Sequence, residues 1–142
     1  MTKSCKERWA AHKDSRCRDL RRLWRAYQEG EDCAYAKRVS QDIGEFHEYG
    51  LCFDYVPPGT FNDQREGYWR YQISWGGPSE EFRFYSSSPR HFPYRITFVF
   101  LDWFDGYERK LMGDDEKLLN EIWGWFEEVG STENEFEKAM ES

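Results

Sequence analysis

The stretch YWRYQISWGGPSEEFRFYSSSPRHFPYRITFVFLDWFD, residues 68–105, decides the fold, because it holds three aromatic-rich runs separated by two breaks. In the first run, residues 68–75, large apolar side chains occupy every second position and mostly polar ones lie between them. This alternation is typical of an antiparallel strand with one buried face, so the polar face is expected to meet water or a partner. The Gly-Gly-Pro-Ser sequence at 76–79 predicts a turn, and residues 81–85 should return as the next strand.

The third run, residues 94–103, is the longest of the three. It is apolar on both faces from Ile96 to Leu101 apart from Thr97, which predicts the central strand of the sheet. The dipeptide Asp105-Gly106 is a hairpin signal, so residues 107–112 should turn back beside this strand. Upstream, residues 51–56 alternate as a further strand, and the Pro-Pro-Gly sequence at 57–59 should end it.

Helical periodicity flanks this region on both sides. Apolar side chains recur every three or four residues over 3–28, where Gly30 should end the helix, and a second helix is expected over 32–49. Residues 113–130 begin with acidic side chains, which suit a helix N-terminus, and carry one apolar stripe that should pack on the sheet. Residues 131–142 are polar and acidic except for Phe136, which predicts a frayed or mobile tail.

The sequence therefore predicts an α+β fold in a single domain, residues 1–142. An antiparallel β-sheet of four to five strands carries two N-terminal helices and one C-terminal amphipathic helix packed on it. The expected parts are 1–49 (helical), 50–112 (antiparallel sheet), 113–130 (helix) and 131–142 (flexible acidic tail). No apolar run approaches the roughly 20 residues of a membrane helix, and no secretory signal opens the chain, so a cytoplasmic protein is expected.

No residue pattern indicates a cofactor or a reaction. Glycine motifs for nucleotides are absent, and no patterned Ser or Cys accompanies the three histidines, so a non-enzymatic protein without a cofactor is expected. The cysteines are Cys5, Cys17, Cys33 and Cys52. None belongs to a C-x-x-C pair, but together with His12 and His47 they leave a metal site conceivable. The alternative is a set of reduced, partly buried thiols.

Charge is distributed unevenly along the chain. Residues 1–28 carry nine Lys or Arg against three acidic residues, a balance of +6, so the remaining residues carry −13 of the total of −7. Four arginines, Arg18, Arg21, Arg22 and Arg25, lie close together on the first helix. One interpretation is that these arginines contact a nucleic acid. The alternative is that they form a solvated face of the helix, or a face paired with the acidic C-terminal part. The acidic remainder of the chain opposes a nucleic-acid partner.

Acidic and aromatic residues at predicted strand ends and turns form a second candidate site. Carboxylates there could lie where the phosphates of a nucleic acid would lie, as in a DNA mimic, while exposed aromatics would anchor a protein partner. The alternative is that the acids only keep the protein soluble. The candidate partner-binding residues are Asp63, Glu66, Trp75, Gly76, Gly77, Glu80, Glu81, Asp102, Asp105, Asp114 and Asp115.

The stretch FDYVPPGTFNDQREGYWRYQISWGGPSEEFRF, residues 53–84, resembles small accessory proteins of plasmids and phages. The resemblance continues through LDWFDG at 101–106 and the last amphipathic helix, to Phe126, whereas the basic first helices lie outside it. Some proteins of this kind act against host defence, as anti-CRISPR or antirestriction proteins. The resemblance implies no catalytic residue.

Two hypotheses follow from the sequence. In the first, the protein is a non-enzymatic anti-defence inhibitor that binds a nucleic-acid-processing protein complex of the host through an acidic and aromatic surface. In the second, it is a nucleic-acid-binding accessory protein that uses the Arg-rich first helix. Neither hypothesis involves a membrane or a cofactor.

Overall fold

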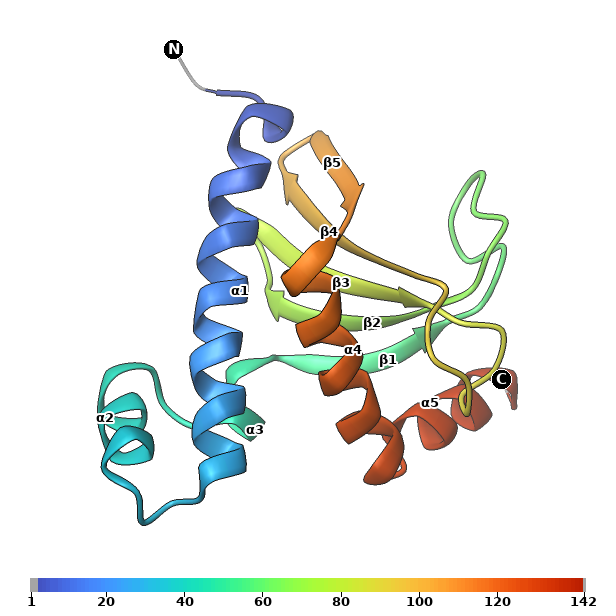
Figure 1. Ribbon diagram of the computed structural model, residues 1–142. Helices are drawn as coiled ribbons and strands as arrows, with labels where there is room; N and C mark the ends of the chain where they lie inside the picture. Colours follow the sequence, from blue (N-terminus) through green and yellow to red (C-terminus); the bar gives the residue numbers. More distant parts are fainter. Residues whose placement is uncertain (1–2, 142) are drawn as a thin grey trace.

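The computed structural model describes residues 3–141, in which five antiparallel strands form one sheet and the helices cover one of its faces (Figure 1). The predicted α+β class is confirmed. The strands are β1 (Cys52–Val56), β2 (Tyr68–Ser74), β3 (Ser79–Tyr85), β4 (Arg95–Asp102) and β5 (Asp105–Lys110). The helices are α1 (Cys5–Glu29), α2 (Ala34–Ile43), α3 (Phe46–Tyr49), α4 (Gly113–Glu128) and α5 (Ser131–Met140).

The strands follow one another across the sheet in the order β1-β2-β3-β4-β5. The central strand is therefore β3, and the expectation that residues 94–103 form the centre is wrong. β4 has the sequence pattern of a strand that is buried on both faces. Thr97 and Val99 are indeed almost fully buried, although no helix covers their face of the sheet. The apolar residues on both faces of β4 are explained by the curvature of the sheet and by the long side chains of the neighbouring strands. They do not make β4 the central strand.

The hairpin between β4 and β5 turns at Trp103 and Phe104, two residues before the predicted Asp105-Gly106 turn. Asp102 pairs with Asp105, and Leu101 pairs with Gly106, so Asp105 and Gly106 already belong to the returning strand. A Cβ atom at Gly106 would lie 2.5 Å from Cδ2 of Leu101. The glycine lets the partly exposed Leu101 side chain pack closely across the strands, and a larger residue would require that side chain to move.

Helix α1 lies along the sheet over β4 and β5. A capping box begins it, because the Ser4 side chain accepts from the Glu7 amide while Glu7 accepts from the Ser4 amide. Its buried face consists of Cys5, Trp9, Cys17, Leu20 and Leu23. Trp9 Nε1 also donates to the carbonyl of Phe98 at 2.7 Å, which fixes the helix to β4.

The second predicted helix, 32–49, is in fact two helices. Gly44 ends α2 with a φ of 90°, a left-handed conformation that glycine adopts without a steric penalty, and the short α3 follows. The break lets the chain turn so that Phe46 is buried against α1 and α4. Both α2 and α3 lie at the C-terminal end of α1 (Figure 1).

Residues 131–141 pack on the rest of the domain, so the predicted frayed or mobile tail is wrong for them, and Ser142 lies outside the described residues. Residues Ser131–Met140 form α5, in which Thr132 is only 1% exposed and Phe136 stacks on Trp69 with ring centroids 5.8 Å apart. Trp69 Nε1 donates to the carbonyl of Thr132 at 2.9 Å. One large apolar side chain and one backbone contact thus hold a segment whose composition is otherwise acidic.

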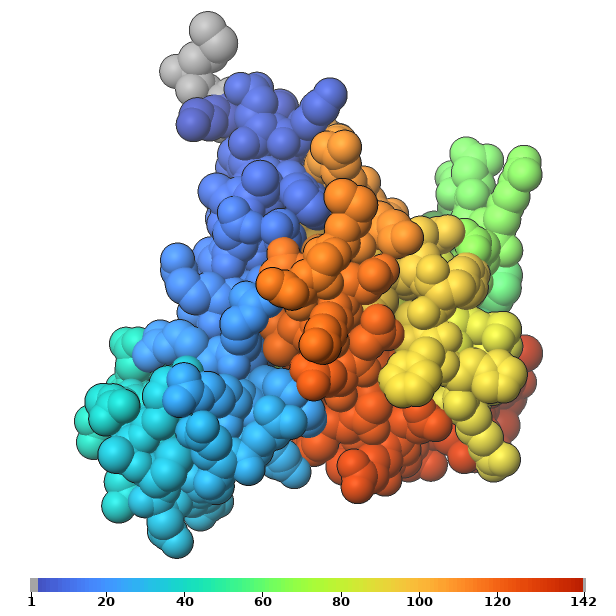
Figure 2. Space-filling view, in the orientation of Figure 1, coloured from blue at the N-terminus to red at the C-terminus, as the bar shows by residue number. Residues whose placement is uncertain are grey.

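The helices and the β3–β4 loop form a continuous outer layer on one side of the sheet. In Figure 2, α4 lies between α1 and the loop of residues 86–94. Beneath this layer the main core combines aromatic side chains of the strands, such as Phe82, Phe98 and Phe100, with Leu119 and Trp123 of α4.

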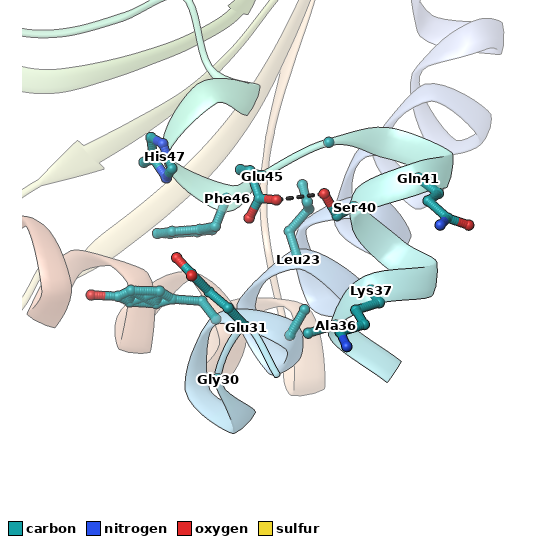
Figure 3. Close-up of a pocket in the computed structure, with 13 residues that line it drawn as sticks. Leu23, Gly30, Glu31, Ala36, Lys37, Ser40, Gln41, Glu45, Phe46 and His47 are labelled. Atoms are coloured by element: carbon teal, nitrogen blue, oxygen red, sulfur yellow. Dashed lines mark hydrogen bonds between the residues drawn. The ribbon is translucent and has the colours of Figure 1, made fainter. Parts of the chain in front are cut away.

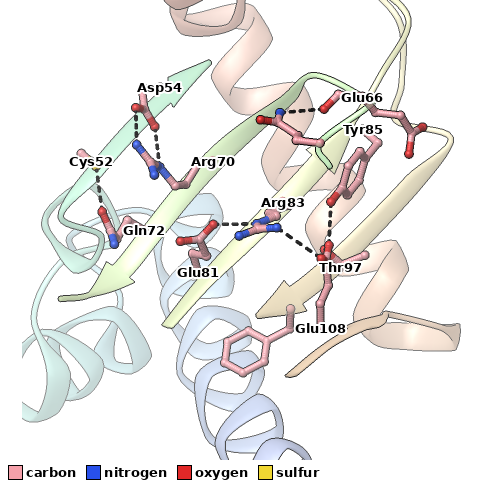
Figure 4. Close-up of polar contacts among 12 residues, drawn as sticks. Cys52, Asp54, Glu66, Arg70, Gln72, Glu81, Arg83, Tyr85, Thr97 and Glu108 are labelled. Carbon is pink, nitrogen blue, oxygen red and sulfur yellow. Dashed lines mark hydrogen bonds and ion pairs between the residues drawn. The ribbon is translucent and has the colours of Figure 1, made fainter. Parts of the chain in front are cut away.

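The opposite face of the sheet carries a polar network (Figure 4). Arg70 forms a two-pronged pair with Asp54, and Arg83 links Glu81 to Glu108. Gln72, predicted to lie on a face that meets water or a partner, is instead buried. The arginine and carboxylate side chains of this network lie along the sheet and cover much of this face.

Candidate functional site: the hairpin-tip surface

Two adjacent turns at one end of the sheet expose large aromatic side chains. Ser79 pairs with Leu101, so the turn between β2 and β3 lies beside the turn between β4 and β5. Trp75 is 73% exposed, Trp103 90%, and Phe104 fully exposed. We call the set Trp75, Gly76, Gly77, Leu101, Trp103 and Phe104 the hairpin-tip surface. Large apolar side chains exposed on neighbouring turns are of the kind that marks protein interaction sites.

Trp103 has a backbone conformation that a tryptophan rarely adopts. Its φ is 58°, at the first central position of a two-residue hairpin, where turns with a positive φ usually have glycine. Outside glycine such a conformation costs about 1 kcal/mol or more. Because its side chain is almost fully exposed, packing within this chain does not offset that cost.

The carboxylates that flank the turn are occupied by the start of α1. Asp102 accepts from Arg8 at 2.6 Å, and Asp105 accepts from the Cys5 amide at 2.9 Å. The hydrogen bond from the Cys5 amide lowers the pKa of Asp105 below its ordinary range. Asp102 and Asp105, both predicted partner-binding residues, therefore fix the hairpin to α1 and orient its tip.

Glu80 is an internal residue and is not accessible at the turn where the sequence placed it. Its side chain accepts from Arg16 at 2.7 Å and 3.1 Å, lies 3.3 Å from His12, and is almost fully buried. Burial raises the pKa of Glu80, but the bonds from Arg16 lower it further, so the net shift is downward. The bulge in β2 between Gln72 and Ser74 changes the local pairing and places Glu80 opposite Ser74.

Glu81 points to the opposite face of the sheet, where it is 3% exposed and pairs with Arg83 at 2.7 Å. Two consecutive strand residues necessarily point to opposite faces. Glu80 and Glu81 cannot share one partner-binding surface, although the sequence placed them together.

The remaining predicted acids lie elsewhere. Asp63 and Glu66 are in the β1–β2 loop, at the other end of β2 from the hairpin-tip surface, and Glu66 accepts from Tyr94 and Arg95. Asp114 is exposed in the first turn of α4, while Asp115 pairs with Lys13 at 2.8 Å. The structure brings Trp75, Gly76, Gly77, Asp102 and Asp105 together and separates the other six candidates from them.

The arginines proposed for nucleic-acid contact are largely paired within the chain. Arg21 pairs with Asp115 at 3.2 Å and Arg22 with Asp42 at 2.8 Å. Arg25 pairs with Glu29 and lies 3.9 Å from the Tyr35 ring centroid. Arg18 alone of the four has no ion-pair partner among residues 3–141. The predicted pairing with the acidic C-terminal part therefore holds for Arg21 alone of the four, whereas Arg22 and Arg25 pair with acidic residues of the N-terminal helices.

The cysteines and histidines do not gather into one site. Within residues 3–141, no group of three or more His, Cys, Asp or Glu side chains is placed to hold a metal ion. Cys5 and Cys17 are buried, and burial raises the pKa of the Cys17 thiol to about 12. Cys52, on the edge strand β1, is exposed. In the part of the chain that the structure describes, no helix combines the length and apolarity needed to span a membrane.

Sequence reasoning missed Leu101, Trp103 and Phe104 as exposed residues, because it extended the strand through Trp103. One signal was available: in DWFD, two acidic residues flank the two residues of a tight turn.

Neither a protein-family model, nor a curated protein, nor a solved structure matches this chain.

Proposed function

We propose that this protein is a non-enzymatic anti-defence inhibitor, of the anti-CRISPR kind, encoded by a phage or plasmid. It binds a nucleic-acid-processing protein complex of the host and does so through the hairpin-tip surface. The observation that supports this proposal best is Trp103, an almost fully exposed tryptophan in a left-handed turn. A residue that weakens the fold and stays almost fully exposed among residues 3–141 is explained by contact with a partner.

The composition of the surface favours a protein partner. Tryptophan and other large aromatics supply most of the binding energy at protein interfaces, where they insert into pockets of the partner. The net charge of −7 adds a long-range attraction for basic surfaces, which proteins that bind nucleic acids expose. The resemblance to plasmid and phage accessory proteins in residues 53–126 supports the class of target.

The test is binding of the purified protein to a panel of purified host defence complexes, including RNA-guided nucleases and restriction enzymes. We expect co-elution with one of them and loss of its DNA binding. The variants Trp103→Gly and Phe104→Ser should each weaken this complex by about 30-fold, the usual effect of removing an interface anchor. Trp103→Gly should also raise the free energy of unfolding by about 1 kcal/mol, because glycine relieves the positive φ.

The matched control is Phe92→Ala, which removes an aromatic side chain that is 67% exposed from the β3–β4 loop and should leave binding unchanged. The proposal is wrong if no complex co-elutes, or if Trp103→Gly and Phe104→Ser bind as well as the unmodified protein.

The nucleic-acid alternative is separated from this proposal by a mobility-shift assay. Salt-sensitive binding that is lost when Arg18, Arg21, Arg22 and Arg25 are replaced by alanine would support the alternative. Because three of these arginines are paired internally, we expect no shift of duplex DNA even at low salt.

A further inference from the structure

A second candidate site lies at the other end of α1 from the hairpin-tip surface. It is a cavity of about 610 Å³ between the C-terminal part of α1, α2 and α3 (Figure 3). This volume is within the range of ligand pockets, about 300–1,000 Å³. Its floor is apolar and is formed by Leu23, Ala26, Ala36 and Phe46.

Aromatic rings line one side of this cavity and are held in place from behind. The ring centroids of Tyr27 and Phe46 are 5.6 Å apart. Trp125 packs edge-on against Phe46 and donates its Nε1 hydrogen to the Tyr27 hydroxyl at 3.1 Å. Phe46 is buried while Tyr27 is half exposed, so the pair presents a rigid aromatic wall to the cavity. The faces of such rings carry negative charge density and attract cations.

Two helices end at this cavity with their negatively polarised termini. Gly30, which follows the last residue of α1, and Gly44, which follows the last residue of α2, both line it. The last carbonyls of a helix carry a partial negative charge that a basic side chain in the final turn commonly offsets. Neither α1 nor α2 has a basic residue in its last turn.

The carboxylate of Glu31 also lines the cavity, as does one cation, Lys37. Figure 3 shows the Glu31 side chain extending toward Phe46. Within residues 3–141 Glu31 forms no hydrogen bond or ion pair, whereas the nearby Glu45 accepts from Ser40. The cations on this part of α1 are used elsewhere, because Arg22 pairs with Asp42 and Arg25 with Glu29. Lys37 lies on α2, across the cavity from Glu31.

From this geometry we infer that the cavity between α1, α2 and α3 binds a basic side chain, an arginine or a lysine, presented by a peptide segment. The apolar floor would receive the methylene groups, and the aromatic wall, Glu31 and the two helix C-termini would surround the charged end. An anion would meet the two helix C-termini and the unpaired carboxylate. A purely apolar ligand would leave Glu31 without a partner.

The inference is independent of the proposed function, since no residue of the hairpin-tip surface lines this cavity. It is tested with the full chain and Nα-acetyl-arginine methylamide as the probe, by following backbone amide NMR shifts during titration. We expect saturable shifts confined to residues 23–47 and Trp125, with a dissociation constant in the range of about 1 mM for so small a ligand. The citrulline analogue has the same shape without the charge and should bind at least about fivefold more weakly. The lysine analogue then shows whether the site prefers a guanidinium or an ammonium group.

Two variants that each remove one negative charge identify the residue responsible. Glu31→Gln should weaken binding of the arginine probe by about fivefold. Asp32→Asn is the matched control, because Asp32 is adjacent but does not line the cavity, and it should change binding less than twofold. The inference is overturned if the citrulline analogue binds as tightly as the arginine probe, if Asp32→Asn has the same effect as Glu31→Gln, or if the shifts are not confined to residues 23–47 and Trp125.

Discussion

At the scale of single residues, Glu80 shows why surface and interior acids are hard to separate in this chain. Its carboxylate lies between the sheet and α1, where Arg16 and Ser74 donate to it. Arg16 also donates to Tyr49, whose hydroxyl donates to Asp19. The buried charge is thus tied to a chain of polar contacts that joins α1 to the β2–β3 hairpin and to α3.

Removing Arg16 should leave the Glu80 carboxylate buried without its main partner. We expect Arg16→Gln to lower the free energy of unfolding by about 2–3 kcal/mol at neutral pH, since a broken buried pair leaves an uncompensated charge. Urea denaturation followed by tryptophan fluorescence measures this loss.

The matched control is Arg90→Gln, which breaks the exposed Arg90–Glu133 pair and should cost less than about 0.5 kcal/mol. The double variant with Glu80→Gln should recover part of the Arg16→Gln loss, because the buried charge is then gone. Equal losses for Arg16→Gln and Arg90→Gln would contradict this account of Glu80.

The candidate site could be predicted only in part, for reasons that lie in individual residues. Trp75 directly precedes the Gly-Gly turn signal at residues 76–77, and its exposure at a hairpin end was foreseeable. The pairing of Asp102, Glu80 and Asp115 with the first helix joins residues about 60 to 100 positions apart. The local sequence around a carboxylate does not show whether a basic residue so far away along the chain pairs with it. Free and paired carboxylates therefore cannot be told apart from the sequence.

At the scale of elements, α5 is the clearest case of tertiary packing overriding composition. An isolated acidic helix of 10 residues is marginal in water. Here Phe136 packs against Tyr55 and Trp69, so the helix closes the end of the core beside β1. The segment is a structural part of the domain.

Replacing Phe136 should therefore destabilise the whole fold. We expect Phe136→Ala to lower the free energy of unfolding by about 2 kcal/mol, less than for a fully buried phenylalanine because this ring is only partly buried. Chemical denaturation measures the change. Met140→Ala, on an exposed position of the same helix, should have an effect within about 0.5 kcal/mol. A mobile tail would instead give equally small effects for both variants.

The strands were easier to predict than the helices. Residues 68–75 and 94–103 alternate or run apolar over a strand's length between turn-forming residues, and β2 and β4 lie within these ranges. The order of strands was not predictable, because apolarity on both faces does not distinguish a central strand from its neighbour in a curved sheet. The α2–α3 break at Gly44 was hidden because glycine inside a helical pattern does not always end a helix.

At the scale of the whole molecule, ion pairs join a basic helix to an acidic body. Arg8 with Asp102, Arg16 with Glu80 and Lys13 with Asp115 are distributed along α1. These ion pairs differ from the apolar contacts of Leu20 and Leu23 with the core, which do not depend on pH. Attachment of α1 therefore has a component that depends on ionised carboxylates.

Acid should weaken the fold through these carboxylates. Burial raises the pKa of Glu80 and of Asp115, but their basic partners lower each pKa further, so both lie below their ordinary values. As the pH falls, these two carboxylates are therefore protonated at a higher pH in the unfolded chain than in the folded protein. Stability from these groups is complete above about pH 5 and declines as the pH falls through about 4 and below. Urea denaturation between pH 7 and pH 3 should show this decline, and a Glu80→Gln, Asp115→Asn variant should show a shallower one. Identical pH profiles for the two proteins would contradict it.

The long reach of α1 has a consequence for synthesis of the chain. Cys5 contacts Asp105, so the helix is made about 100 residues before the hairpin that receives it. At about 5–20 residues per second, translation leaves it without cover for roughly 5–20 s. During that interval Trp9, Leu20 and Leu23 are exposed within residues 1–28, which carry a charge of +6, close to ribosomal RNA of opposite sign. We expect the nascent helix to bind either a holding chaperone or that RNA, and a circular permutant that places α1 last should shorten the interval.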